Sequence, residues 1–216
     1  MITIKEIFDF QRQYCAYYHV LEADFVETEK YLTVNPDNYT AYSNEFINQI
    51  QAICGEVDVT LKYLCKLINP KFNGHTLPHY KECIMGSNPF FARASVGFVR
   101  VQDMMLTPWS AWGKVTEEDD AVLSPEWWKM YNKIKHDRTA IHPETKKPYY
   151  KYANQGNTLN ALAALYIVIS YTLFILCQFV PEEDANYFIN EWRNSSKLFN
   201  AFVVRGVDQV IATMAP

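Results

Sequence analysis

Glycine is scarce in this sequence, with 7 glycines among 216 residues. The scarcity disfavours collagen-like, glycine-rich and turn-dense all-β folds, and it leaves little material for a glycine loop that cradles phosphates. Hydrophobic residues make up 49% of the chain and charged residues 20%, a balance that excludes a disordered chain. The composition therefore indicates a globular, mainly helical protein that can fold without a disulfide or a metal.

Paired cysteine motifs are also missing. The five cysteines share no C-x-x-C spacing; they are Cys15, Cys54, Cys65, Cys83 and Cys177. An odd number of cysteines fits buried free thiols in a reducing compartment. Lys5, Glu6 and Asp9 interrupt the N-terminal stretch that would be apolar in a signal peptide. We therefore expect a cytoplasmic protein with reduced cysteines.

Histidines are spaced for metal binding at one place only. His75, His79 and Cys83 follow one another at intervals of four residues, a spacing that suits metal ligation on one helix face. Pro78 lies between the two histidines, so His75 is expected to precede the helix, and no fourth ligand is apparent. We therefore expect neither a metal nor a cofactor.

An overall excess of positive charge is absent, since 20 Lys and Arg stand against 24 Asp and Glu, a net charge of −4. A generally basic nucleic-acid binder is therefore not indicated. Residues 124–151, however, hold seven Lys and Arg against three Asp and Glu, a local charge of +4. Even on an acidic protein, such a patch can attract phosphate. The alternative is a solvent-exposed face whose excess of basic residues has no function.

No charged residue lies between Lys151 and Glu182. Within this stretch, Ala161–Cys177 is long enough for a borderline membrane span. Asn157 and Asn160 at its start, and several hydroxyl side chains along it, favour the buried central helix of a bundle instead. We expect no membrane span, and a membrane anchor formed by residues 157–180 is the alternative.

Apolar residues recur at helical spacing through most of the chain. The pattern predicts long helices over residues 3–32, 40–68 and 155–179, and shorter helices over 77–85, 124–138 and 184–193. β-branched and aromatic residues at 91–112 predict a hairpin or extended flap, which a strand at 198–204 would join, and residues 117–120 predict a solvated linker. The fold expected is mainly α, a helical bundle in one domain over residues 1–216, with a small antiparallel β element inserted at about residues 88–113.

The basic segment at 124–142 reads SPEWWKMYNKIKHDRTAIH. On a helix, Trp127, Tyr131 and Ile134 share a face that should be buried, and Arg138 falls on that face if the helix reaches it. A guanidinium facing a bundle interior must be paired. The opposite, wet face and its flanks carry one histidine and the candidate phosphate-binding residues: Lys129, Asn132, Lys133, Lys135 and His136.

Arginine and histidine near one another are the minimum set for metal-free RNA cleavage. Histidine transfers protons because its pKa lies near neutral, and arginine holds the phosphate through a fork of donors. The candidate catalytic residues are therefore Arg138, His142 and His136, with Asn157 and Asn160 supporting the site. The alternative is that Arg138 pairs with an internal acid, that the histidines are surface groups and that the asparagines mark close helix packing.

The segment W-x-x-Y-N-x-I-K-H-D-R at 128–138, followed by Ala153-Asn154 and by NTLNALAAL at 157–165, resembles HEPN-like helical-bundle proteins of bacteria and phages. The resemblance implies a bundle of about four to five long helices that often forms a homodimer. Many such proteins are metal-independent ribonucleases of toxin–antitoxin or phage-defence systems, and others bind nucleotides or partners without catalysis. Arg138 best matches the arginine of their active motif and His142 is its nearest partner, across a gap shorter than that motif has.

Three functional hypotheses follow. The first is an RNA- or nucleotide-binding protein, with or without metal-independent ribonuclease activity in a defence or toxin system. The second is a non-catalytic helical module that forms a homodimer or binds a protein partner. The third is a membrane-associated protein anchored by residues 157–180.

Overall fold

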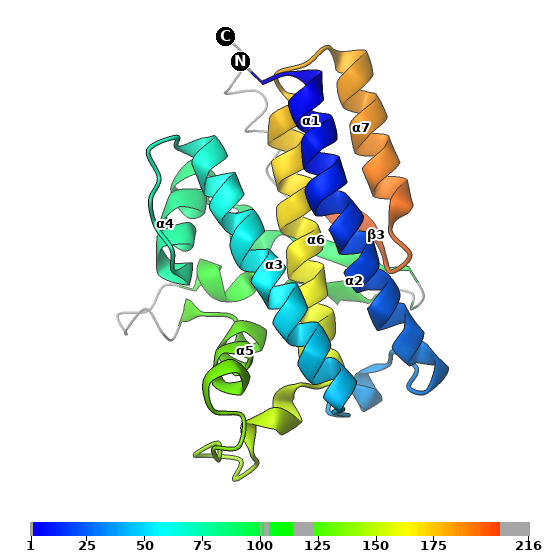
Figure 1. The fold of residues 1–216 in the computed structure, drawn as a ribbon, viewed down its shortest axis with the longest axis vertical. Coiled ribbons are helices and arrows are strands. Elements are labelled where there is room, and N and C mark those ends of the chain that lie inside the picture. Colours follow the sequence, from blue (N-terminus) through cyan, green and yellow to red (C-terminus); the bar gives the residue numbers. More distant parts are fainter. Residues whose placement is uncertain (1, 100, 102–103, 115–122, 204–216) are drawn as a thin grey trace.

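A computed structural model describes residues 2–99, 101, 104–114 and 123–203 of this chain (Figure 1). The linker expected at 117–120 lies outside the described residues. The fold is mainly helical with a small antiparallel sheet, as the sequence predicts.

The N-terminal helix expected over 3–32 is one continuous rod. It runs through α1 (Ile4–Phe10), a π-helical turn (Gln11–Cys15), α2 (Ala16–Glu27) and a 3₁₀ turn (Thr28–Lys30). Thr3 and Glu6 form a capping box that satisfies free backbone N–H groups at the first turn. The helix is confirmed, and the sequence gives no sign of the π-helical turn inside it.

The remaining helices lie close to their expected bounds. They are α3 (Asn44–Ile68), α4 (Leu77–Ser87), α5 (Glu126–Asp137), α6 (Gln155–Cys177) and α7 (Glu182–Ser195). The Ser43 hydroxyl accepts a hydrogen bond from Phe46 N and so caps α3. Helix α5 begins two residues after the expected start at 124, with Pro125 at the N-cap position, where it makes no side-chain cap bond.

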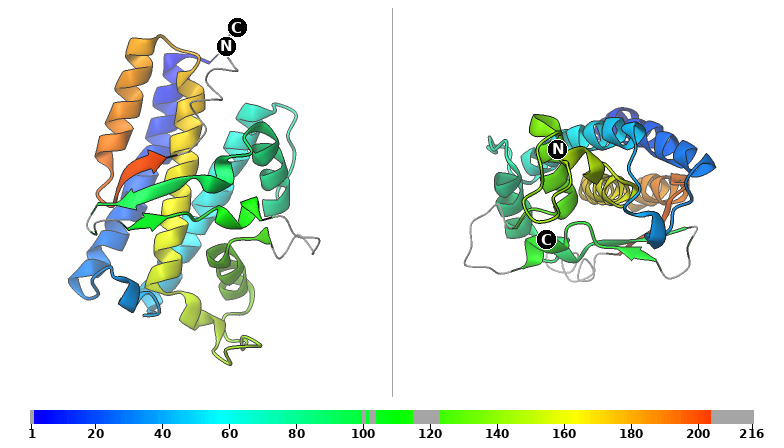
Figure 2. Two further views of the ribbon diagram at one scale, coloured as in Figure 1. Left: turned by 180° about the vertical axis from the view of Figure 1, so that it is seen from behind. Right: turned by 90° about the horizontal axis from the view of Figure 1, so that it is seen from below.

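Three short strands form an antiparallel sheet in the order β2-β1-β3: β1 (Ser95–Phe98), β2 (Met105–Leu106) and β3 (Phe199–Val203). Val96 pairs with Leu106 on one side and with Phe202 on the other, so the expected union of the hairpin with the late strand is confirmed. The sheet crosses α6 on the side of the molecule turned toward the viewer in the left panel of Figure 2.

Helix α6 is the centre of the bundle. It contacts α1, α2, α3, α5 and α7 as well as β1 and β3. By length and composition it is apolar enough to cross a membrane, and 83% of its most apolar window is buried inside the fold. The prediction of a buried central helix is confirmed, and cytoplasmic localisation stays a prediction.

A buried carboxylate joins α2 to the start of β3. Glu22 is 1% exposed, and its Oε1 accepts hydrogen bonds from Tyr18 Oη at 3.0 Å, from the Ser196 hydroxyl, and from the backbone N–H groups of Lys197 and Leu198 at 3.0 and 3.1 Å. Its Oε2 lies 3.6 Å from His19 Nδ1. Desolvation raises the pKa of Glu22, but the hydrogen bonds together outweigh it and hold this pKa below its ordinary value.

Candidate functional site: a basic end of the bundle

The buried face of α5 decides which of its residues face solvent. Trp127, Tyr131 and Ile134 are buried, as the helical projection predicts. Trp127 Nε1 donates a hydrogen bond to the backbone carbonyl of Pro108 at 3.0 Å, which fixes the rotation of α5 against the segment after the sheet. The polar face of α5 is therefore turned outward.

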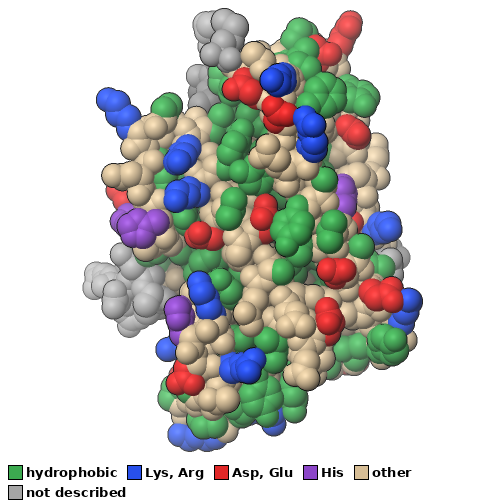
Figure 3. Space-filling view, viewed as in Figure 1, with side chains coloured by type: hydrophobic (Ala, Val, Ile, Leu, Met, Phe, Trp, Pro, Cys, Tyr) green, Lys and Arg blue, Asp and Glu red, His purple; other side chains and the backbone are tan. Residues whose placement is uncertain are grey.

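Cations gather on this polar face and on the loop that follows it. We call this surface the basic end and define it by eight residues: Lys133, Lys135, His136, Arg138, His142, Lys146, Lys147 and Lys151. Six of them are exposed, and His142 and Lys151 are partly buried. Basic side chains appear over α5 and the segment after it at the lower end of the space-filling view (Figure 3). The basic end thus presents positive charge from one helix and one loop to solvent.

Backbone hydrogen bonds fold the loop back onto the end of α5. Tyr150 N donates to Arg138 O at 2.8 Å, Tyr149 N to Ala140 O at 3.0 Å, and His142 N to Lys147 O at 2.9 Å. The chain therefore returns beside its outgoing segment and brings the lysines after His142 to the same end of the molecule as Arg138.

The His142 ring is held by the loop. Its Nδ1 accepts hydrogen bonds from the backbone N–H groups of Glu144 and Thr145 at 3.3 and 3.4 Å. The ring lies 5.6 Å from the Tyr149 ring and 5.3 Å from the Tyr152 ring, centroid to centroid. Because Nδ1 is an acceptor, the neutral imidazole carries its proton on Nε2, which is the nitrogen left to act on a ligand.

Aromatic rings lie beneath several of the cations. Lys133 Nζ is 5.7 Å from the centroid of the Tyr149 ring, and Lys151 Nζ is 5.4 Å from that of Tyr42. Tyr42 in turn meets Tyr150 edge to face at 5.8 Å. The basic end therefore combines positive charge with flat apolar surface, the two features that phosphates and bases require of a nucleic-acid surface.

The expected burial of Arg138 is wrong. Helix α5 ends at Asp137, and Arg138 is its C-cap residue, so the chain turns away before a buried position would be reached. The Arg138 side chain is exposed and forms no ion pair within the described residues. The prediction of the solvent-facing side of α5 is wrong in part as well. Lys129 and Asn132 are partly buried, whereas Lys133, Lys135 and His136 are exposed.

The two asparagines act on the backbone rather than on the basic end. Asn157 Nδ2 donates to Tyr152 O, and Asn160 Nδ2 donates to Gly156 O, each at 2.9 Å. The expectation that they orient an arginine–histidine pair is therefore wrong at Asn160, whose amide closes a bond within its own helix. Asn157 supports the site only indirectly, by fixing the end of the loop that carries Lys151.

Sequence reasoning missed part of this surface. The segment whose local charge is +4 includes Lys146, Lys147 and Lys151. The helical projection that selects Lys133 and Lys135 ends before these three lysines. Tyr42 is more than one hundred residues from Lys151 in the chain, and no spacing rule links them. Only the fold brings the start of α3 beside the start of α6, where Gln155 N donates to Ala41 O at 3.0 Å.

Comparison of the chain with family models, with curated proteins and with solved structures gives no match.

Proposed function

We propose that this protein binds RNA at the basic end, with Arg138 as the main phosphate contact. The observation that carries the proposal is the position of Arg138, exposed at the C-terminus of α5 without an ion-pair partner among the described residues. A guanidinium in this position keeps its fork of donors free for the paired oxygens of a phosphate.

Neighbouring groups support the same role. Lys146 and Lys147 are exposed on the returning loop, where they add positive charge along a phosphate backbone. Tyr42 and Tyr150 provide ring faces beside Lys151 on which bases can stack. A loop held by so many backbone bonds positions its cations in advance, which lowers the entropic cost of binding.

Cleavage is a second step of the proposal. In it, a 2′-hydroxyl loses its proton to water and its oxygen attacks the neighbouring phosphorus, which Arg138 holds. The bond from phosphorus to the 5′-oxygen breaks, and the imidazolium form of His142 gives that oxygen the Nε2 proton, with no metal required. Loss of the Nε2 proton from neutral His142 would leave an imidazolate, so this step requires that Nδ1 exchange its two hydrogen bonds from the loop for a proton. His136, exposed in the last turn of α5, is the alternative proton-transfer group.

The direct test compares the wild type with Arg138→Ala in binding and cleavage of a mixed RNA substrate in EDTA. Arg138→Ala should weaken binding by roughly 10-fold, as expected for loss of one charge-assisted phosphate contact, and should remove any cleavage. Arg12→Ala is the matched control, because Arg12 is an exposed arginine on the N-terminal rod, paired with Asp9 at 2.8 Å.

Three outcomes are informative. If the wild type binds RNA but cuts none, the binding proposal stands and the catalytic step is wrong. If Arg138→Ala and Arg12→Ala bind RNA as the wild type does, the proposed site is wrong. Cleavage that is equal in all three proteins indicates a contaminating nuclease.

A further inference from the structure

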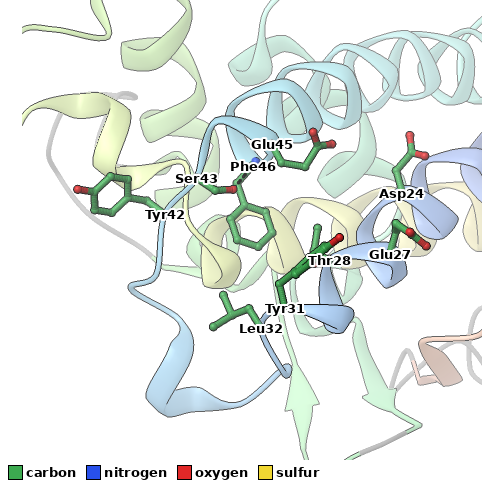
Figure 4. A pocket seen from close by; sticks show the side chains of 9 residues that line it. All are labelled: Asp24, Glu27, Thr28, Tyr31, Leu32, Tyr42, Ser43, Glu45 and Phe46. Carbon is green, nitrogen blue, oxygen red and sulfur yellow. Dashed lines mark hydrogen bonds between the residues drawn. The ribbon is translucent and has the colours of Figure 1, made fainter.

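A pocket of about 570 Å³ lies between the end of α2 and the start of α3. Figure 4 shows its wall on one side made by Asp24, Glu27 and Thr28, with Glu45 and Phe46 from the first turn of α3 on the other. Leu32 and the buried Phe46 ring supply apolar lining. The pocket is therefore a mixed site, apolar inside and polar at its rim.

The rim of the pocket carries negative charge. Asp24, Glu27 and Glu45 are all exposed. Of these three acids, only Glu27 forms an ion pair within the described residues, and its partner is Lys30. Asp24 and Glu27 lie in the last turn of α2, and Lys30, in the 3₁₀ turn that continues the rod, pairs with Glu27. Carboxylates at the negative end of a helix dipole are unfavourable unless a cation joins them.

Two tyrosines complete the pocket. Tyr31 is 89% exposed and Tyr42 is 48% exposed, so both rings are open to solvent at the rim of the pocket. Tyr42 already has the Lys151 ammonium over its ring at 5.4 Å, so we assign the cation of a ligand to the more exposed Tyr31 ring. Aromatic faces together with carboxylates are the combination that binds organic cations.

A buried polar side chain behind the wall fixes the spacing of two residues of the pocket. Gln49 is 4% exposed, and its Nε2 donates to Asp24 O at 2.9 Å and to Glu45 Oε1 at 3.1 Å, two residues that line the pocket. Its own Oε1 has no hydrogen-bond partner among the described residues. This oxygen is buried behind the lining residues, so Gln49 acts on the pocket through the Asp24 backbone and the Glu45 carboxylate that its Nε2 holds in place.

We propose that this pocket binds an alkyl cation, a guanidinium or ammonium group on a short apolar chain. The charged head would meet Asp24 and Glu45, and the alkyl chain would lie against Phe46 and Leu32 under the Tyr31 ring. The pocket shares Tyr42 with the proposed RNA surface, but its carboxylates repel phosphate, so the two sites take different ligands. The cation comes either from a free amine or from an arginine or lysine side chain of a protein.

The test uses calorimetry or NMR titration with butylguanidinium and with its neutral counterpart, butylurea. The wild type should bind butylguanidinium and bind butylurea at least roughly 10-fold more weakly, because only the first has a charge for the carboxylates. Tyr31→Ala should weaken butylguanidinium binding by roughly 2- to 5-fold, and Asp24→Asn/Glu45→Gln by roughly 10-fold or more. All these side chains are exposed, so the variants should fold.

Matched controls lie on α7. Tyr187 is an exposed tyrosine, and Glu182 and Glu183 are exposed acids, so Tyr187→Ala and Glu182→Gln/Glu183→Gln should leave binding unchanged. Equal binding of the charged and neutral probes, equal losses in the pocket and control variants, or no binding of butylguanidinium at millimolar concentration would overturn the proposal. Tighter binding of N-acetyl-arginine methylamide than of butylguanidinium identifies a protein side chain as the source, and weaker binding identifies a free amine.

Discussion

At the scale of single residues, the molecule depends on a few polar side chains that hold distant segments together. Glu22 is the clearest case, because one carboxylate oxygen accepts four hydrogen bonds and ties α2 to residues 196–198 before β3. No Lys or Arg pairs with it among the described residues, and the His19 ring lies beside its other oxygen at 3.6 Å. Its charge is therefore stabilised mainly by neutral donors.

This arrangement predicts a dependence of stability on pH. Because the pKa of Glu22 is lower in the folded than in the unfolded state, its contribution is complete above the unfolded value and is lost as pH falls through the folded value. Glu22→Gln should lower the free energy of unfolding by about 2 kcal/mol at pH 7. The difference from the wild type should shrink as the pH falls from 5 toward 3.

Denaturant unfolding of both proteins between pH 3 and pH 7 measures this difference. Glu144→Gln is the control, because Glu144 is exposed in the loop after α5 and should change stability little at any pH. A Glu22→Gln deficit that stays constant down to pH 3 would contradict the proposed role of the buried charge.

At the scale of elements, the helices and their approximate bounds were predictable, but the exposure of the residue that ends α5 was not. The apolar stripes of α3 and α5 repeat every three or four residues, and their buried residues follow that repeat. The end of α5 at Asp137 depends on the loop that returns to bond Arg138 O and Ala140 O, a long-range feature that no local pattern contains. Arg138 is exposed because it is the C-cap residue, one position past the last residue of α5.

The junction between α6 and residues 32–41 is a second feature that the sequence concealed. Gln155 is fully buried, and its Nε2 donates to Leu32 O and Thr33 O at 3.2 and 3.1 Å. Gly156 N donates to Tyr39 O at 3.1 Å, and a Cβ atom at Gly156 would lie 2.9 Å from Tyr39 Cβ. The glycine allows the two backbones to approach this closely.

Gly156→Ala should therefore lower the free energy of unfolding by about 1–3 kcal/mol, because the added methyl group forces the Tyr39 segment away. Gly55→Ala is the matched change in α3, where nothing lies within 4 Å of the new Cβ. It should raise stability by about 0.5–1 kcal/mol through helix propensity. Thermal or urea unfolding of the two variants measures these changes in the free energy of unfolding. Equal changes at both glycines would contradict the close contact at Gly156.

At the scale of the whole molecule, charge is separated at one end of the bundle. Basic side chains gather over α5, and acidic side chains gather over the lower part of α2 in the same view (Figure 3). The proposed RNA surface and the proposed cation pocket meet at Tyr42, which contacts Lys151 on one side and lines the pocket on the other. The two surfaces thus adjoin, but each presents charge of one sign to its own ligand.

The local charge of segment 124–151 pointed to this end of the molecule, whereas the acidic pocket had no signal in the sequence. Asp24 and Glu45 lie on different helices, and only the packing of α2 against α3 brings them to one cavity. The net charge of −4 hides both surfaces because it averages over them.

The salt dependence of RNA binding tests the central claim most directly. Binding of an RNA oligonucleotide should be measured from 50 to 200 mM salt for the wild type, Arg138→Ala and Lys146→Ala/Lys147→Ala. The account predicts that affinity falls steeply with salt for the wild type, and that the slope decreases by about one for each phosphate-contacting cation removed. Absence of binding at 50 mM salt, or one slope shared by all three proteins, would contradict RNA binding at the basic end.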